Sequence, residues 1–166
     1  MSMNKILVSA CLLGNKVRYD SNDVPTESNL LDEWNSEGRL IAFCPEVAGG
    51  LSVPRLPAEI RSEDGNAVLD GTAKVFDNQG NDVSENFING AKKALETAQN
   101  NQVKVAILKE KSPSCGSSFI YDGTFASVRK VGQGVTTALL ERNGIKVFSD
   151  LEIEKAAEFF ENLTEL

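Results

Sequence analysis

Three short apolar runs that are typical of β-strands are each followed closely by a cysteine. The runs are 5–10, 40–43 and 103–108, and the cysteines are Cys11, Cys44 and Cys115. If the runs are neighbouring parallel strands, their C-terminal ends lie on one edge of a sheet, where open α/β folds place their ligands. We therefore expect three thiols that are far apart in the sequence to meet at one site.

Helical periodicity between these runs predicts the remaining elements. The predicted strands are 5–10, 40–44, 103–108 and 145–148, and the predicted helices are 27–37, 83–100, 135–142 and 151–164. Ser84 and Asp150 are the expected N-caps of the second and fourth helices. The alternation of strands and helices predicts one domain over residues 1–166, a three-layer, Rossmann-like α/β fold with an open, mostly parallel sheet.

Turn residues predict a small β-hairpin insert in this domain. Residues 45–58 hold three prolines and a glycine pair, which argue against a regular helix or a central strand and predict a long functional loop. Asp64-Gly65-Asn66 predicts a hairpin that pairs 59–61 with 67–69, with a further short strand at 74–76. A second hairpin is expected over 119–128, around Asp122-Gly123.

Composition narrows the chemistry that is open to the chain. It has 166 residues, no histidine, three cysteines and a net charge of −7. The missing histidine excludes Ser-His-Asp and Cys-His hydrolases and Cys2His2 zinc fingers. The low, odd cysteine count predicts a reducing compartment, the cytoplasm. The absence of basic runs argues against general nucleic-acid binding, and no run approaches the roughly 18 apolar residues of a membrane span. The oligomeric state is not predicted.

The three cysteines have a structural and a functional interpretation. Cys11 and Cys44 would suit small buried apolar side chains, but Cys115 lies in the polar turn Ser112-Pro113-Ser114-Cys115-Gly116. As soft ligands, three thiolates favour zinc or an iron–sulfur cluster. A structural zinc site normally has four protein ligands, so a site with three favours a catalytic centre with an open position.

Four segments resemble the thiouracil desulfurase (TudS) family, and they occur in the family's order. They are Val8-Ser9-Ala10-Cys11-Leu12-Leu13-Gly14, Cys44-Pro45-Glu46-Val47-Ala48-Gly49-Gly50-Leu51, Pro54-Arg55-Leu56-Pro57-Ala58-Glu59-Ile60 and Ser112-Pro113-Ser114-Cys115-Gly116. Gly134-Val135-Thr136 and Gly144-Ile145 also fit the family pattern. The resemblance covers about residues 4–150.

The resemblance implies a 4Fe–4S cluster held by Cys11, Cys44 and Cys115, with one iron not bound by protein. It implies an enzyme that removes sulfur hydrolytically, without redox change, from a thiolated uracil base, nucleoside or nucleotide and releases sulfide. The free iron would act as a Lewis acid on the thiocarbonyl sulfur. Thiouracil or 4-thiouridine monophosphate is the expected small-molecule partner, rather than tRNA, because the chain is acidic.

Proton transfer in such a site needs side chains, and the resemblance implies Glu46 as the acid/base and Ser112 as its partner. With no histidine, a carboxylate near the cluster is the best general base. The alternative is that Glu46 is a solvated loop residue and that Ser112 caps a turn.

Several residues are weaker candidates for substrate binding. Arg55 could clamp a carbonyl oxygen or a phosphate, or it could be a surface arginine. Ser117, Ser118 and the predicted helix start at Gly132-Gln133-Gly134 could donate to an anion. Arg18, Tyr19 and Asp20, just after Cys11, are similar candidates.

Three other functions are compatible with the same cysteines. A zinc-dependent hydrolase would use them to activate water. A cysteine-persulfide sulfur carrier would need one reactive thiolate of lowered pKa. A metal-dependent binding or sensing module would leave Glu46 and Ser112 without roles.

Overall fold

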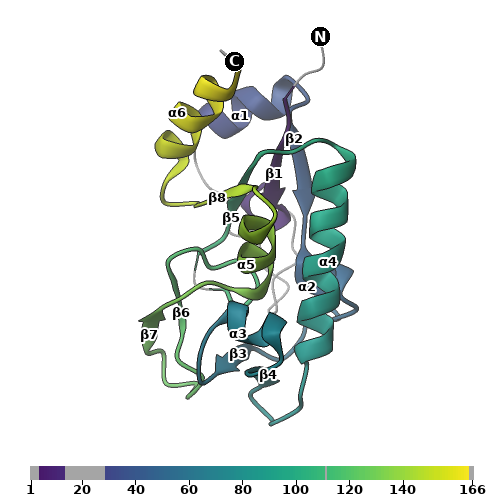
Figure 1. Ribbon diagram of the computed structural model, residues 1–166, viewed down its shortest axis with the longest axis vertical. Helices are drawn as coiled ribbons and strands as arrows, with labels where there is room; N and C mark the ends of the chain where they lie inside the picture. The colour runs from purple at the N-terminus through teal and green to yellow at the C-terminus, as the bar shows by residue number, and fades with distance from the viewer. Residues whose placement is uncertain (1–3, 14–28, 111, 165–166) are drawn as a thin grey trace.

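The computed structural model describes residues 4–13, 29–110 and 112–164. Four parallel strands form the central sheet, in the order β2-β1-β5-β8 (Figure 1). Their bounds are β1 Ile6–Ser9, β2 Leu40–Phe43, β5 Val105–Leu108 and β8 Lys146–Ser149. The main helices are α1 Asn29–Ser36, α4 Ser84–Asn100, α5 Val135–Arg142 and α6 Ile153–Thr164. The predicted α/β fold with a parallel sheet is confirmed.

Helices cover both faces of the sheet because the buried strands are apolar on both sides. Ile6 and Val8 of β1 pack in one core with α1 and α6, where the Trp34 and Phe160 rings meet at 5.8 Å. Leu7, which points to the opposite face, packs with α4 and α5. The strand is completely buried between these two layers.

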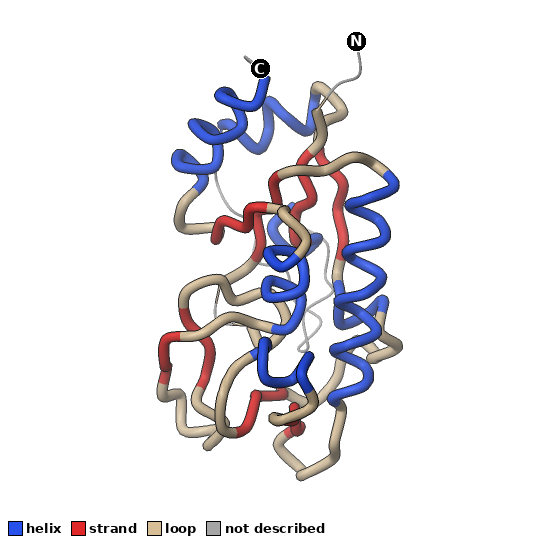
Figure 2. The backbone as a smooth tube through the Cα atoms, viewed as in Figure 1, coloured by secondary structure: helices blue, strands red, loops and turns tan. Residues whose placement is uncertain are grey.

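Two small antiparallel sheets lie at the end of the molecule away from α1 and α6 (Figure 2). β3 (Ala58–Arg61) pairs with β4 (Lys74–Asp77), and β6 (Phe119–Tyr121) pairs with β7 (Arg129–Val131). The second of these is the hairpin expected over 119–128, with its return strand starting at 129. The β1 and β2 strands run toward this end, so the C-terminal edge of the main sheet faces the small sheets (Figure 1).

The hairpin that was expected between 59–61 and 67–69 is wrong, because Asp64-Gly65 starts a helix instead of a turn. The Asp64 side chain accepts hydrogen bonds from the backbone N–H groups of Asn66 (3.0 Å) and Ala67 (3.4 Å), which caps helix α3, Gly65–Asp70. Aspartate suits both a turn and an N-cap, so the local sequence alone did not distinguish them.

Three local expectations are corrected. Residues 45–48 form the single-turn helix α2, Pro45–Ala48, because proline is tolerated in the first turn, where its missing N–H would have had no helical partner. Val83 rather than Ser84 is the N-cap of α4, and the Ser84 hydroxyl accepts from the Val75 N–H at 2.8 Å. Helix α6 begins at Ile153, so Asp150 does not cap it; its carboxylate accepts from the Glu110 N–H at 2.9 Å.

Helix α4 holds α2 at unusually close range. Two glycines make this approach possible: a Cβ on Gly49 would lie 2.0 Å from the Asn86 carbonyl oxygen, and one on Gly90 would lie 2.0 Å from that of Pro45. Side chains of α4 also hold α2, since Asn86 Nδ2 donates to the Gly49 carbonyl at 2.9 Å. The position of α2, and of Cys44 just before it, therefore depends on the absence of side chains at this crossing.

Gly90→Ala should destabilise the protein by about 1–3 kcal/mol, since the new methyl group overlaps backbone that cannot move away alone. Urea unfolding measures the loss. Asn89→Ala, at the neighbouring exposed position of the same helix, is the matched control and should be neutral or stabilising. Equal stability of the two variants would show that α2 has room to shift.

Candidate cofactor and active site

All three cysteines line one cavity of about 380 Å³ at the C-terminal edge of the sheet. Cys11 lies in η1 (Ala10–Leu13), the 3₁₀ turn directly after β1, and Cys44 is the N-cap of α2 after β2. Cys115 lies in the loop after β5. Strand β1 pairs with β2 on one side and β5 on the other, so the three strand ends are adjacent. The expected meeting of the three thiols is therefore present in the fold.

The surroundings of Cys44 and Cys115 disfavour negative charge on sulfur. Cys11 and Cys115 are buried, and Cys44 is partly exposed. Burial raises the pKa of the Cys115 thiol far above its usual range, and negative charge at Cys44 and Glu46 adds to the rise. Burial also raises the pKa of Cys44, against the opposing effect of hydrogen bonds from the Val47 and Glu46 backbone. Negative charge on these sulfurs therefore needs a bound cation to offset it.

The donor set fits an iron–sulfur cluster. Thiolates are the usual ligands of such clusters, and each cysteine binds a different iron, so the sulfurs need not converge on one point. In the described part of the chain, no three His, Cys, Asp or Glu side chains are grouped as a site for a single metal ion. Three thiols around one cavity, two of them buried, are compatible with the wider spacing of a cluster.

Glu46, Ser112 and Arg55 form a connected polar group in the same cavity. Glu46 lies in the first turn of α2, two residues after Cys44, and its Oε1 accepts from Arg55 Nε at 3.2 Å. Ser112 Oγ donates to Glu46 Oε2 at 3.4 Å. The Arg55 side chain is only 6% exposed and that of Glu46 19%, so neither is a solvated surface group.

Backbone contacts orient the Ser112 hydroxyl. Its oxygen accepts from the N–H groups of Ser114 at 3.0 Å and Cys115 at 3.2 Å. With both lone pairs occupied, the single hydroxyl proton points to Glu46. Ser112 thus links the Cys115 loop to the carboxylate that follows Cys44.

The N-terminus of α5 holds the Cys115 loop, so the donors that were considered for an anion at Gly132-Gln133-Gly134 are used within the protein. The Val135 N–H donates to the Pro113 carbonyl at 2.8 Å, and the Thr136 N–H donates to the Ser114 carbonyl at 2.9 Å. Thr137 Oγ1 donates to the Cys115 carbonyl at 3.0 Å. These helical N–H groups would otherwise have no partner, and here they bind protein carbonyls in place of an anion.

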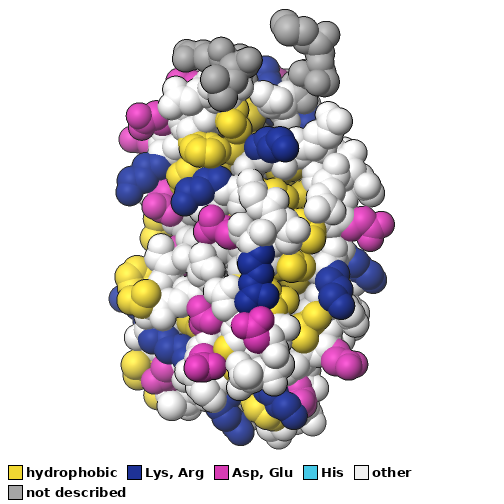
Figure 3. Space-filling view, viewed as in Figure 1, with side chains coloured by type: hydrophobic (Ala, Val, Ile, Leu, Met, Phe, Trp, Pro, Cys, Tyr) yellow, Lys and Arg dark blue, Asp and Glu magenta, His cyan; other side chains and the backbone are white. Residues whose placement is uncertain are grey.

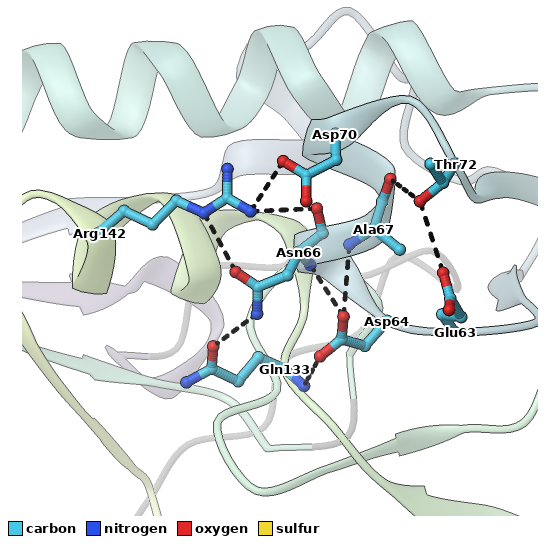
Figure 4. A network of polar contacts seen from close by, with 8 residues as sticks. All are labelled: Glu63, Asp64, Asn66, Ala67, Asp70, Thr72, Gln133 and Arg142. Atoms are coloured by element: carbon cyan, nitrogen blue, oxygen red, sulfur yellow. Dashed lines mark hydrogen bonds and ion pairs between the residues drawn. The ribbon is translucent and has the colours of Figure 1, made fainter.

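A polar network extends this support to α3 (Figure 4). Asp64 Oδ2 accepts from the Gln133 N–H at 3.4 Å, and Asn66 bonds both Gln133 and Arg142 through its side chain. Gly134, between these contacts and α5, lies so near the loop that a Cβ would be 2.5 Å from the Ser114 carbonyl. The caps of two helices therefore fix the backbone behind Cys115.

Glu110 is a site residue that the sequence analysis missed. It is 4% exposed, and its carboxylate accepts from the N–H groups of Ser117, Ser118 and Phe119 and from the Ser117 hydroxyl, at 2.9–3.2 Å. Ser117 and Ser118 thus face Glu110, and the structure does not bring them into the lining of the described cavity. The signal available in the sequence was a glutamate two residues after the predicted strand 103–108.

Other lining residues carried no distinguishing signal in the sequence. They include three aromatic side chains, Phe43, Tyr121 and Phe125. They also include the polar or charged side chains of Glu59, Asn78, Lys109 and Ser127. Lys109 Nζ lies 3.3 Å from Asp150 Oδ2. Arg18, Tyr19, Asp20 and the Gly14 end of the first motif lie outside the described residues.

Glu110→Ala should cost about 1–3 kcal/mol, because it leaves four partly buried hydrogen bonds without their acceptor. It should also lower the iron that the protein retains after reconstitution, since these donors shape the turn that carries Cys115. Unfolding midpoints and iron assays measure both effects. Ser117→Ala, which removes one of the four bonds, is the graded control; an effect as large as that of Glu110→Ala would contradict this account.

The fold and cavity define a three-layer α/β protein with three thiols in one cavity at the C-terminal edge of its sheet. The family model of 2-thiouracil desulfurase matches residues 6–152. The chain is 45% identical over 148 residues to the uncharacterized protein YbbK of Bacillus subtilis (strain 168), with 89% of this chain and 97% of YbbK covered. The chain therefore belongs to the 2-thiouracil desulfurase family.

A solved structure supports the same assignment. The [4Fe-4S]-dependent thiouracil desulfidase TudS superposes with a TM-score of 0.88 at 46% sequence identity, covering 96% of this chain and 99% of TudS. Among the described helices, none has the length and apolar character needed to cross a membrane.

Proposed function

We propose that this protein is a [4Fe–4S]-dependent desulfidase that converts the C=S group of a thiolated uracil into C=O with water and releases sulfide. The observation that carries the proposal is the meeting of Cys11, Cys44 and Cys115 in one cavity with Glu46 and Ser112. The family membership and the 46% identity to TudS support it.

The three cysteines would hold the cluster, one iron each. When bound, the cluster supplies an iron without a protein ligand, a Lewis acid for the thiocarbonyl sulfur without any net redox change. Because Cys11 and Cys115 are buried, the protein around them would exclude water from the side of the cluster that faces it.

Glu46 is the general acid/base of the proposed reaction. It takes a proton from water as the oxygen adds to the ring carbon, and it returns a proton as sulfide leaves. Arg55 Nε holds one carboxylate oxygen, and Ser112 Oγ donates to the other, so the carboxylate is fixed in orientation. Arg55 is therefore a positioning residue for Glu46. Its guanidinium also lines the cavity and is the candidate contact for a substrate carbonyl or phosphate.

The substrate is proposed to be a small thiolated pyrimidine, as a base, nucleoside or nucleotide such as 4-thiouridine monophosphate. The cavity has the size range of small-molecule sites. The chain carries a net charge of −7, and acidic and basic side chains are interspersed over the face in Figure 3, which supports a small substrate over a long RNA. A single domain in the cytoplasm remains our expectation. Ser117 and Ser118 were candidates for direct contact with the substrate, and they are left out of the proposal because both donate to Glu110.

Anaerobic purification should give a brown protein with iron and acid-labile sulfide in equal amounts and with sulfide release from 2-thiouracil. Replacing Cys11, Cys44 or Cys115 by Ala should each abolish iron binding, since a cluster on two cysteines has lost a ligand. Zinc without sulfide would instead support the hydrolase, and activity that depends on one cysteine alone would support the persulfide carrier.

Glu46→Gln should retain iron and sulfide but lower kcat by about 10²–10⁴-fold, the usual contribution of a general acid–base group. Sulfide release under saturating 2-thiouracil measures it. Glu85→Gln, an exposed glutamate in the first turn of α4, is the control for the loss of one charge. Unchanged turnover in Glu46→Gln would remove Glu46 from the mechanism.

A further inference from the structure

The hairpin β6–β7 contributes three residues to the cavity although it is not part of the main sheet. Tyr121, Phe125 and Ser127 line the same space as the cysteines. Phe125 nevertheless remains 36% exposed, so its ring is not a core side chain. An aromatic ring at the wall of a ligand-sized cavity is available to cover a bound molecule.

The backbone of this connection is held in an unfavourable conformation. Phe125 and Ser127 have φ angles of 58° and 60°, in the left-handed region that side-chain-bearing residues rarely adopt. Such conformations persist only where surrounding contacts impose them, and they cluster at ligand-binding segments. Both residues of this strained pair line the cavity.

Glu59 holds part of this backbone in place. It lies on β3, is 9% exposed, and its Oε1 accepts from the N–H groups of Gly123 (3.0 Å) and Phe125 (3.2 Å). Gly123 lies against the same strand, where a Cβ would be 2.7 Å from the Ile60 carbonyl oxygen. A buried carboxylate thus fixes the Phe125 backbone beside the cavity.

We infer that Phe125 is a substrate-binding residue whose ring packs on the face of the substrate heterocycle, with Glu59 as its positioning residue. The inference deepens the proposed function and rests on it. A planar pyrimidine has two π-faces, and an aromatic side chain stacks on either one without regard to ring substituents. Glu46 lies on α2, Ser112 in the Cys115 loop and Arg55 between α2 and β3, so recognition of the ring and chemistry at sulfur use separate elements.

Phe125→Ala in the cluster-loaded protein tests the inference. It should raise KM for 2-thiouracil and Kd for uracil, which cannot turn over, each about tenfold, the effect of removing one stacking ring. The kcat should stay within about twofold and iron content should be unchanged, since the ring does not hold the cysteines. Phe125→Tyr should restore both constants. Val131→Ala, at an 83% exposed position on β7, is the matched control.

Glu59 is tested with the same measurements. Glu59→Gln keeps an acceptor oxygen for both N–H groups and should stay near the wild type, whereas Glu59→Ala should reproduce the rise in KM and Kd. Unchanged KM and Kd in Phe125→Ala, or a loss of iron equal to the loss of activity, would overturn the inference. A wild-type protein that binds uracil yet releases no sulfide from 2-thiouracil would overturn the proposed function and leave this inference standing.

Discussion

Parallel pairing of β1 with its two neighbours is the constraint from which the site follows. Ile6, Leu7 and Val8 each pair with a residue of β2 and a residue of β5, so the three strands end at one level. Cys11, Cys44 and Cys115 follow those ends at distances of a few residues. A sheet with another strand order would separate the thiols by a strand spacing of about 5 Å or more for each strand inserted between them.

The charges within the cavity act against one another: the Glu46 carboxylate disfavours negative thiolates nearby, and the Arg55 guanidinium is positive. Burial and the Glu46 carboxylate both disfavour negative sulfur at Cys44 and Cys115, while Arg55 offsets part of the charge of Glu46. Arg55 is hydrogen-bonded to the carboxylate, and its charge also favours a negative Cys44, but burial outweighs this effect and the pKa of Cys44 stays raised. The negative charge of the thiolates is therefore compensated by the positive centre that they bind. This compensation makes binding of that centre favourable.

The sequence was sufficient for the main sheet and its helices because apolar runs and helical periodicity are strong local signals. Helix α5 has the predicted bounds, and the three cysteines lie at strand ends as expected. Prediction was weakest where a short polar motif suits two structures. Asp64-Gly65 predicts a turn and is a helix start, and the N–H groups of Gly132-Gln133-Gly134, a candidate anion site, bind protein oxygens instead. Glu59 and Glu110 were missed because their role lies in accepting N–H groups from segments that only the tertiary fold brings near.

The hydrogen bond from the Glu110 N–H to Asp150 connects strand β8 to the cysteine site. This strand itself supplies no cysteine to the site. The last cysteine is residue 115, yet its loop is held by the start of α5 and, through Glu110, by the residue that follows β8. During synthesis, all three cysteines are therefore made before the segments that hold Cys115 in place. The contacts around Cys115 are complete only once the chain has been made through Asp150, so a product stalled before that residue presents cysteines without a competent site.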